Sequence, residues 1–169
     1  METKELNKML RDRARELGLC NQWYKGWKKK ESKQELIDKY IRGIDFCIEH
    51  DYPKLDFVRA YFSKKILNSN GVFLDDTFDV KGMKNIVLLG SSKGNINYCG
   101  NTTGNVYVRH ESKAVIKAVE GAKVFVETYE GCSVEAFADE HSRIFLYKHG
   151  GSVKTEGNVI IRDKVRAEK

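Results

Sequence analysis

Three histidines lie beside carboxylates or at the ends of apolar runs, which makes them the side chains best suited to acid–base chemistry. His141 follows Asp139 and Glu140, while His110 and His149 stand at the ends of two such runs. A histidine paired with a carboxylate is a common general acid–base arrangement. However, no G-x-S-x-G, H-E-x-x-H, P-loop or G-x-G-x-x-G motif occurs. Since charged residues are expected at turns anyway, we expect no enzyme, no catalytic residues and no cofactor.

The cysteine pattern argues against a metal site. Cys20, Cys47, Cys99 and Cys132 are far apart in sequence and form no C-x-x-C pair, so neither a zinc site nor a redox motif is indicated. We expect small buried thiols in a reducing compartment. The chain begins "METKELNKMLRDR" and has no run of 18 apolar residues, which predicts a cytoplasmic protein without membrane contact.

A basic, aromatic stretch at residues 20–33, "CNQWYKGWKKKESK", offers another kind of chemistry. Residues 1–33 hold ten Lys and Arg against five Asp and Glu, so most of the net charge of +6 lies here. Rings can stack on bases while cations meet phosphates, which would make this an anion or nucleic-acid contact. The alternative, which we favour, is that the tryptophans anchor the stretch to a helical core. The residues concerned are Trp23, Tyr24, Lys25, Trp27, Lys28, Lys29 and Lys30.

A polar turn, "CGNTTGNVY" at 99–107, is the remaining candidate for a ligand. Its hydroxyls and amides are suited to a nucleotide or a sugar. Asn and Gly also supply the left-handed backbone that sharp corners need, and asparagines can form ladders between stacked coils. We favour the corner interpretation for Asn101, Thr102, Thr103 and Asn105.

The elements that carry these residues fall into two unlike regions, 1–70 and 71–169. Apolar residues at helical spacing predict helices over 2–17, from Ser32 to "HDYP", and from Pro53 to "NSNG". Ser32 and Glu35 match the S-x-x-E capping box. Residues 1–70 are therefore predicted to be a three-helix bundle.

Strand-like runs recur through the second region. "NIVLLG", "NVYVRH", "KVFVET", "RIFLYK" and "NVIIRD" begin 20, 18, 20 and 15 residues apart, with weaker runs and turns between them. A period near 19 with two strands per repeat is typical of a solenoid. The prediction is an α+β protein in which the helices precede a short, single-stranded parallel β-helix of four to five coils. An antiparallel sandwich is the alternative fold.

Stacking the strong runs side by side, with their first residues aligned, predicts an outward row of apolar side chains. Ile86, Val106, Val124, Ile144 and Val159 would form one inner column, and Leu88, Val108, Val126, Leu146 and Ile161 a second. The outward row between them would be Val87, Tyr107, Phe125, Phe145 and Ile160. At ~4.8 Å per coil it would be about 20 Å tall, too apolar to remain solvated. The helices, a second subunit or a ligand are the three candidates to cover it.

The repeat resembles the short β-solenoids of bactofilin-like cytoskeletal proteins, which bury aliphatic residues at similar intervals and polymerise. The helices "LNKMLRDRARELGLC" and "IDFCIEHDYPKLDFV" followed by strand repeats look like small uncharacterised proteins of gut anaerobes and their phages. That resemblance implies an accessory protein of a mobile element and no particular activity.

We therefore expect a non-enzymatic interaction or assembly protein that acts through the outward row, as a homo-oligomer or with a host protein. The competing hypothesis is a ligand- or nucleic-acid-binding protein that counters a host defence, either by sequestering a nucleotide signal or by inhibiting a host factor, through residues 23–30 and the polar turn.

Overall fold

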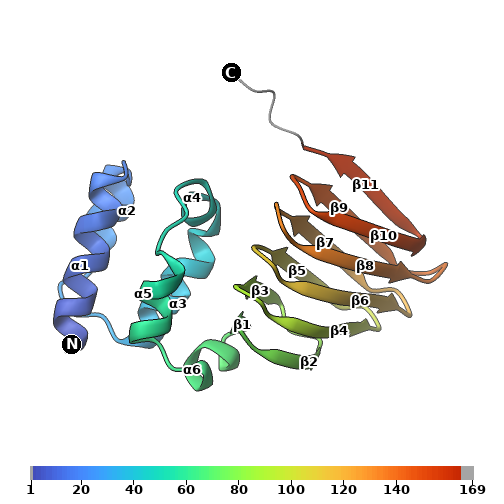
Figure 1. Ribbon diagram of the computed structural model, residues 1–169, viewed down its shortest axis with the longest axis horizontal. Coiled ribbons are helices and arrows are strands. Elements are labelled where there is room, and N and C mark those ends of the chain that lie inside the picture. Colours follow the sequence, from blue (N-terminus) through green and yellow to red (C-terminus); the bar gives the residue numbers. More distant parts are fainter. Residues whose placement is uncertain (1, 165–169) are drawn as a thin grey trace. The chain divides into compact units, whose positions relative to one another are not determined.

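A computed structural model describes residues 2–164, and within them the chain forms six helices and then eleven strands (Figure 1). The chain divides into two compact units, Met1–Asn70 and Gly71–Lys169. Each unit has its own cluster of buried hydrophobic side chains. The predicted order, helices first and parallel strands second, is confirmed.

In the described part of the chain, the helical unit has six helices where the sequence pattern predicts three, because two predicted helices are broken and a further short helix forms over Asn21–Gly26. The predicted second helix is interrupted at Gly43, and the predicted third helix ends at Tyr61 and resumes at Lys64. Gly43 both ends one helix and precedes the next. The bounds are α1 Thr3–Glu16, α2 Asn21–Gly26, α3 Lys33–Arg42, α4 Ile44–Glu49, α5 Leu55–Tyr61 and α6 Lys64–Ser69.

The predicted capping box is present at the start of α3. The Ser32 hydroxyl accepts the backbone N–H of Glu35 at 3.2 Å, and the Glu35 carboxylate accepts the backbone N–H of Ser32 at 2.8 Å. The ammonium of Lys28 lies 3.1 Å from the same carboxylate. These contacts, the Ser32 N–H first, lower the pKa of Glu35 from 4.5 to about 2.

This lowered pKa predicts an acid dependence of the helical unit. Because the folded pKa lies below the unfolded one, the carboxylate stabilises α3 fully above about pH 4.5 and progressively less as the pH falls toward 2. Glu35→Gln should therefore be less stable than wild type at neutral pH, with the difference disappearing in acid. Urea unfolding followed by tryptophan fluorescence measures this, and a difference that persists at low pH would contradict it.

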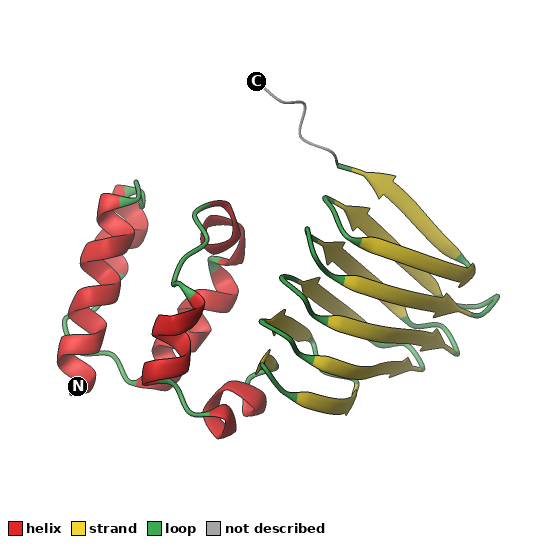
Figure 2. Cartoon of the chain, in the orientation of Figure 1, coloured by secondary structure: helices red, strands yellow, loops and turns green. Residues whose placement is uncertain are grey.

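The second unit is a β-solenoid, as predicted. Successive strands alternate between two sheets, and the paired strands within each sheet are parallel (Figure 2). Among the described residues, sheet A has the order β1-β3-β5-β7-β9-β11 and sheet B the order β10-β8-β6-β4-β2. Sheet A contains β1 Val72–Leu74, β3 Asn85–Leu89, β5 Thr103–Val108, β7 Lys123–Thr128, β9 Arg143–Lys148 and β11 Val159–Asp163. Sheet B contains β2 Thr77–Lys81, β4 Lys93–Cys99, β6 Lys113–Val119, β8 Ser133–Ala138 and β10 Ser152–Gly157.

The register of sheet A differs from the predicted columns by two residues at one step. Val106 pairs with Val126, not with the predicted Val124, because the central coils are 20 residues long. One inner row is therefore Ile86, Val106, Val126, Leu146 and Ile161. The other predicted columns shift in the same way, with Val124 lying beside Gly104 and Val126 no longer following Val108.

Gly104 explains why the sequence pattern misplaced this step. It occupies the inward position of β5 beside Val124, but it has no side chain to mark that position as apolar. A Cβ at Gly104 would overlap the ring of Tyr98, which is 1% exposed and projects from the other sheet. The Tyr98 hydroxyl donates to the carbonyl of Met83 at 2.7 Å. The core thus fills this place with a ring from β4 instead of a side chain from β5.

The cysteines differ in exposure, and the helices are short. Cys47 and Cys132 are buried thiols as expected, whereas Cys20 and Cys99 are exposed, so that expectation was wrong for two of the four. Within residues 2–164, no helix combines the length and the apolar character needed to cross a membrane.

Candidate binding faces of the solenoid

The outer face of sheet A carries a short stack of apolar side chains, which we call the aromatic ridge and define as Phe125, Phe145 and Ile160. These residues lie in register on β7, β9 and β11. The rings of Phe125 and Phe145 are nearly parallel, at 12°, with centroids 5.2 Å apart. Both rings are half-buried and Ile160 is 36% exposed, so the ridge is an accessible surface.

The predicted continuous outward row is wrong, because the 20-residue coil splits it in two. Val87 and Tyr107 pair with each other, but their row continues through Glu127, Tyr147 and Arg162. The row of the ridge begins instead with Asn85 and Asn105. Val87 is also completely buried, while Tyr107 is half-buried. The apolar surface therefore covers the last three coils only.

A polar cluster of Glu127, Tyr129 and His149 lies beside the ridge. The ring of His149 stacks on that of Tyr129, with centroids 4.7 Å apart and planes 5° apart. The Glu127 carboxylate accepts the Tyr129 hydroxyl at 2.7 Å and lies 3.1 Å from Nε2 of His149. These contacts place a histidine against a carboxylate, as acid–base chemistry would need.

Cations surround the rings of this face. The guanidinium of Arg143 lies 6.0 Å from the centre of the Phe145 ring. Arg162 and Lys164 approach the ring of Tyr147 at 5.9 and 5.8 Å. Lys123 lies in register with Arg143 and is exposed. Four cations thus accompany Glu127, which is in contact with His149, so the face favours an acidic partner.

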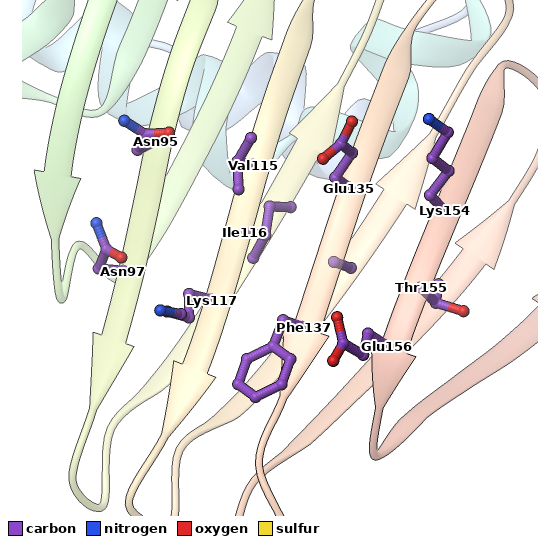
Figure 3. Close-up of a pocket in the computed structure, with 11 residues that line it drawn as sticks. Asn95, Asn97, Val115, Ile116, Lys117, Glu135, Phe137, Lys154, Thr155 and Glu156 are labelled. Atoms are coloured by element: carbon purple, nitrogen blue, oxygen red, sulfur yellow. The ribbon is translucent and has the colours of Figure 1, made fainter.

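The outer face of sheet B is a shallow groove of about 480 Å³ (Figure 3). Two outward rows line it. One contains Asn95, Val115, Glu135 and Lys154, and the other contains Asn97, Lys117, Phe137 and Glu156. Because both signs of charge alternate across the strands, the groove has no field that would select one sign of ion. The groove therefore suits a ligand that carries groups of both signs better than it suits an anion.

Comparison with protein-family models, with curated proteins and with solved structures found no match.

The aromatic side chains of residues 20–33 contact the helical unit itself. Trp27 packs against its core and donates its ring N–H to Asn7 at 2.7 Å. Tyr24 also packs on that core, with the guanidinium of Arg15 5.0 Å from its ring centre. Trp23 is 37% exposed. Lys25, Lys28, Lys29 and Lys30 are all exposed. The rings and lysines therefore do not form one shared stacking platform.

The polar turn makes the contacts of a coil corner. The Thr102 hydroxyl donates to the carbonyl of Cys99 at 3.1 Å, and Gly100 has a positive φ of 68°. The Asn105 side chain donates to that of Asn85 on the preceding coil at 3.2 Å. Asn101 and Thr103 are exposed. These side-chain amides and hydroxyls are thus occupied in part by the fold.

The other histidines have separate surroundings. His110 has a positive φ of 57° at a corner, where its Nδ1 accepts the backbone N–H of Gly90 at 3.3 Å. His141 is exposed beside Glu140, at 3.4 Å. In the part of the chain that is described, no group of three or more His, Cys, Asp and Glu side chains is arranged to hold a metal.

The sequence pattern did not predict the groove on sheet B or the stacking of Tyr129 on His149. The groove follows from the alternate positions of the weak runs around 95, 115, 135 and 154, which the turns between strong runs obscured. The rings of Tyr129 and His149 stack because these residues are 20 positions apart, which is the spacing between β7 and β9. The starts of the strong runs are unevenly spaced and do not indicate this. An alignment at 20-residue spacing, shortened to 19 residues between β8 and β10, brings both sets of residues together.

Proposed function

We propose that this chain is a non-enzymatic interaction protein whose solenoid binds another protein chain through the aromatic ridge. The observation that carries the proposal is the stacked pair Phe125 and Phe145 continuing into Ile160 on an accessible sheet face. Aromatic side chains supply large contact areas at small entropy cost, and they are enriched where proteins bind one another.

The charges around the ridge indicate the chemistry of the partner. Lys123, Arg143, Arg162 and Lys164 frame the rings on this face. A partner segment with carboxylates beside apolar side chains would complement this surface. Such rim charges mainly raise the association rate, so binding should weaken and slow as salt is added.

The same contacts give less support to a nucleic-acid role through residues 20–33. Trp27 and Tyr24 already pack within the helical unit, so they do not offer free faces for bases to stack on. A mobility shift with short single-stranded DNA or RNA at low salt, lost on replacing Lys28, Lys29 and Lys30, would favour that role instead.

Photo-crosslinking from the ridge tests the proposal. Phe125 or Phe145 is replaced by p-benzoylphenylalanine in cells that make the protein, and crosslinked products are identified by mass spectrometry. We expect a discrete protein partner, or a second copy of the chain, from both positions. The matched control is the same photoreactive residue at Phe137, which lies on the outer face of sheet B.

A second variant separates binding from stability. Aromatic pairs on neighbouring strands also stabilise sheets by about 0.2–1 kcal/mol. Phe125→Thr with Phe145→Thr keeps good strand formers and removes the ridge. This variant should remain folded and lose the crosslinked partner when the photoreactive residue is at position 105, which lies in register with position 125 and away from the last coil. Equal crosslinking from position 137, or retention of the partner by the folded ridge variant, would overturn the proposal.

A further inference from the structure

The two ends of the solenoid core differ in exposure. Ile161 on β11 belongs to the inner row of Val126 and Leu146, which are both completely buried, yet it is 44% exposed. Val159 is only partly buried and Thr155 on β10 is exposed. At the other end, Val72, Phe73 and Leu74 of β1 are 1–4% exposed. Among the described residues, the inner row of sheet A is therefore exposed at its carboxy-terminal strand, β11, and the first strand of that sheet, β1, is buried.

The backbone at this end forms two open strand edges. The strand order stops at β10 in sheet B and at β11 in sheet A. In a parallel ladder, alternate residues direct both their N–H and their C=O to the same neighbour. Ser152 donates to Cys132, and Asn158 bonds to both Ala138 and Ile144, so even-numbered residues face the preceding coil. Odd-numbered residues, with Thr155 and Ile161 central, direct their backbone groups outward, where no described strand meets them.

A second copy related by a two-fold axis that passes beside Thr155 and Ile161 would provide hydrogen-bond partners for both open edges at once. The two residues lie at corresponding positions, each two residues from the ends of the corner at Gly157–Val159. Antiparallel pairing about this axis places Ile161 opposite Ile161 of a second copy, and Thr155 opposite its counterpart. Both become pairs that exchange two backbone hydrogen bonds. The exposed Ile161 side chains then continue the inner row from one copy to the next.

The charges of the outward side chains on β10 are complementary across the same two-fold axis. Lys154 and Glu156 flank Thr155, and both are exposed. Under the two-fold, Lys154 lies opposite Glu156 of the second copy, and Glu156 opposite its Lys154. These positions are the closely spaced, non-hydrogen-bonded pairs of an antiparallel ladder, where opposite charges stabilise pairing. A self-complementary pair of this kind is what an isologous contact requires.

We propose that the carboxy-terminal coil docks tail-to-tail on a second copy of this chain and forms a closed dimer. A head-to-tail filament would require an exposed β1 edge to receive β11 in sheet A, whereas β1 is buried. An unrelated strand would satisfy one edge and leave the other open. The contact is two strands wide and about 20 Å long, so the buried interface is small. We therefore expect a dissociation constant in the micromolar range, on the order of 1–100 µM.

The dimer goes beyond the function proposed above and does not depend on it. In sheet A it places Ile160 opposite Arg162 of the second copy, so the outer face continues across the axis. Two aromatic ridges would then belong to one particle, which raises the apparent affinity for a partner with two binding segments.

Charge exchange at β10 tests the proposal. The mass of the full chain is measured by sedimentation velocity from about 1 to 200 µM, a range that brackets micromolar dissociation constants. Wild type should convert from monomer to dimer. Lys154→Glu or Glu156→Lys makes both facing pairs repulsive and should raise the dissociation constant about tenfold or more. The double exchange, with both substitutions in one chain, should restore dimerisation.

The controls make each outcome decisive. Lys117→Glu changes a charge on the same sheet face, two strands inward from β10, and should leave the dimer intact. Thermal unfolding verifies that every variant is folded. A wild type that stays monomeric, single exchanges without effect, or failure of the double exchange to restore the dimer would overturn the proposal. So would dimerisation that appears only after deletion of residues 165–169, since the chain's own tail would then be the occupant.

Discussion

A chain carrying Gly104→Val should lose about 3 kcal/mol or more of solenoid stability, at the upper end of the cost of overfilling a packed core. Even a Cβ at this position would overlap the buried ring of Tyr98. The ring has little room to move, because its hydroxyl is bonded to the carbonyl of Met83. Urea unfolding followed by the circular dichroism of the strands measures the loss.

Removing the ring tests whether the two positions share one volume. Tyr98→Ala alone should cost about 3–5 kcal/mol, as expected for deleting a large buried aromatic side chain. When Gly104→Val is added, the valine enters the vacated space, so the double variant should be more stable than the sum of the single effects by about 1–3 kcal/mol. Thr103→Val, an exposed change on the same strand, is the control and should stay within about 0.5 kcal/mol of wild type. Strict additivity would show that Tyr98 does not pack over Gly104.

The same glycine marks the limit of what the sequence could predict about the solenoid. Alternating aliphatic residues identify inward positions when each of them has a side chain, so the runs at 123–128 and 143–148 were aligned correctly. At 103–108 the first inward residue is Gly104, and the core is filled there from the opposite sheet. A one-dimensional pattern has no signal for a ring that crosses the interior. The two-residue error then joined Tyr107 to Phe125, which lie in different rows.

The helical unit shows a related limit. The capping box at Ser32 could be predicted because its contacts are local. The environment of Trp27 could not, since its ring N–H is bonded to Asn7, 20 residues away. Whether a tryptophan beside lysines stacks on a ligand or packs inside is decided by such distant contacts. The basic stretch was therefore open to two interpretations until the surroundings of each ring were known.

Lys39→Met should destabilise the helical unit by about 3–5 kcal/mol, because it leaves a buried carboxylate without its cation. The side chain of Glu31 is 2% exposed, and its Oε1 lies 3.0 Å from the ammonium of Lys39. The backbone N–H of Lys28 donates to the same oxygen at 3.1 Å, whereas Oε2 has no hydrogen-bond partner in the described chain. Both tryptophans, Trp23 and Trp27, belong to this unit, so fluorescence during urea unfolding reports it selectively.

The double variant Glu31→Leu with Lys39→Met separates the cost of an orphaned charge from the value of the pair. Because two buried charges lose their hydration on folding, replacing both with apolar groups of similar size should recover most or all of the lost stability. Lys28→Met is the control, since its ion pair with Glu35 has side chains 70% and 43% exposed and should contribute little to stability. If Lys39→Met is no more harmful than Lys28→Met, water reaches Glu31 and the carboxylate is not enclosed. If instead the double variant is as unstable as Lys39→Met alone, the pair itself stabilises the fold through the amide of Lys28 and the ring of Trp27, which lies 5.5 Å from the Lys39 ammonium.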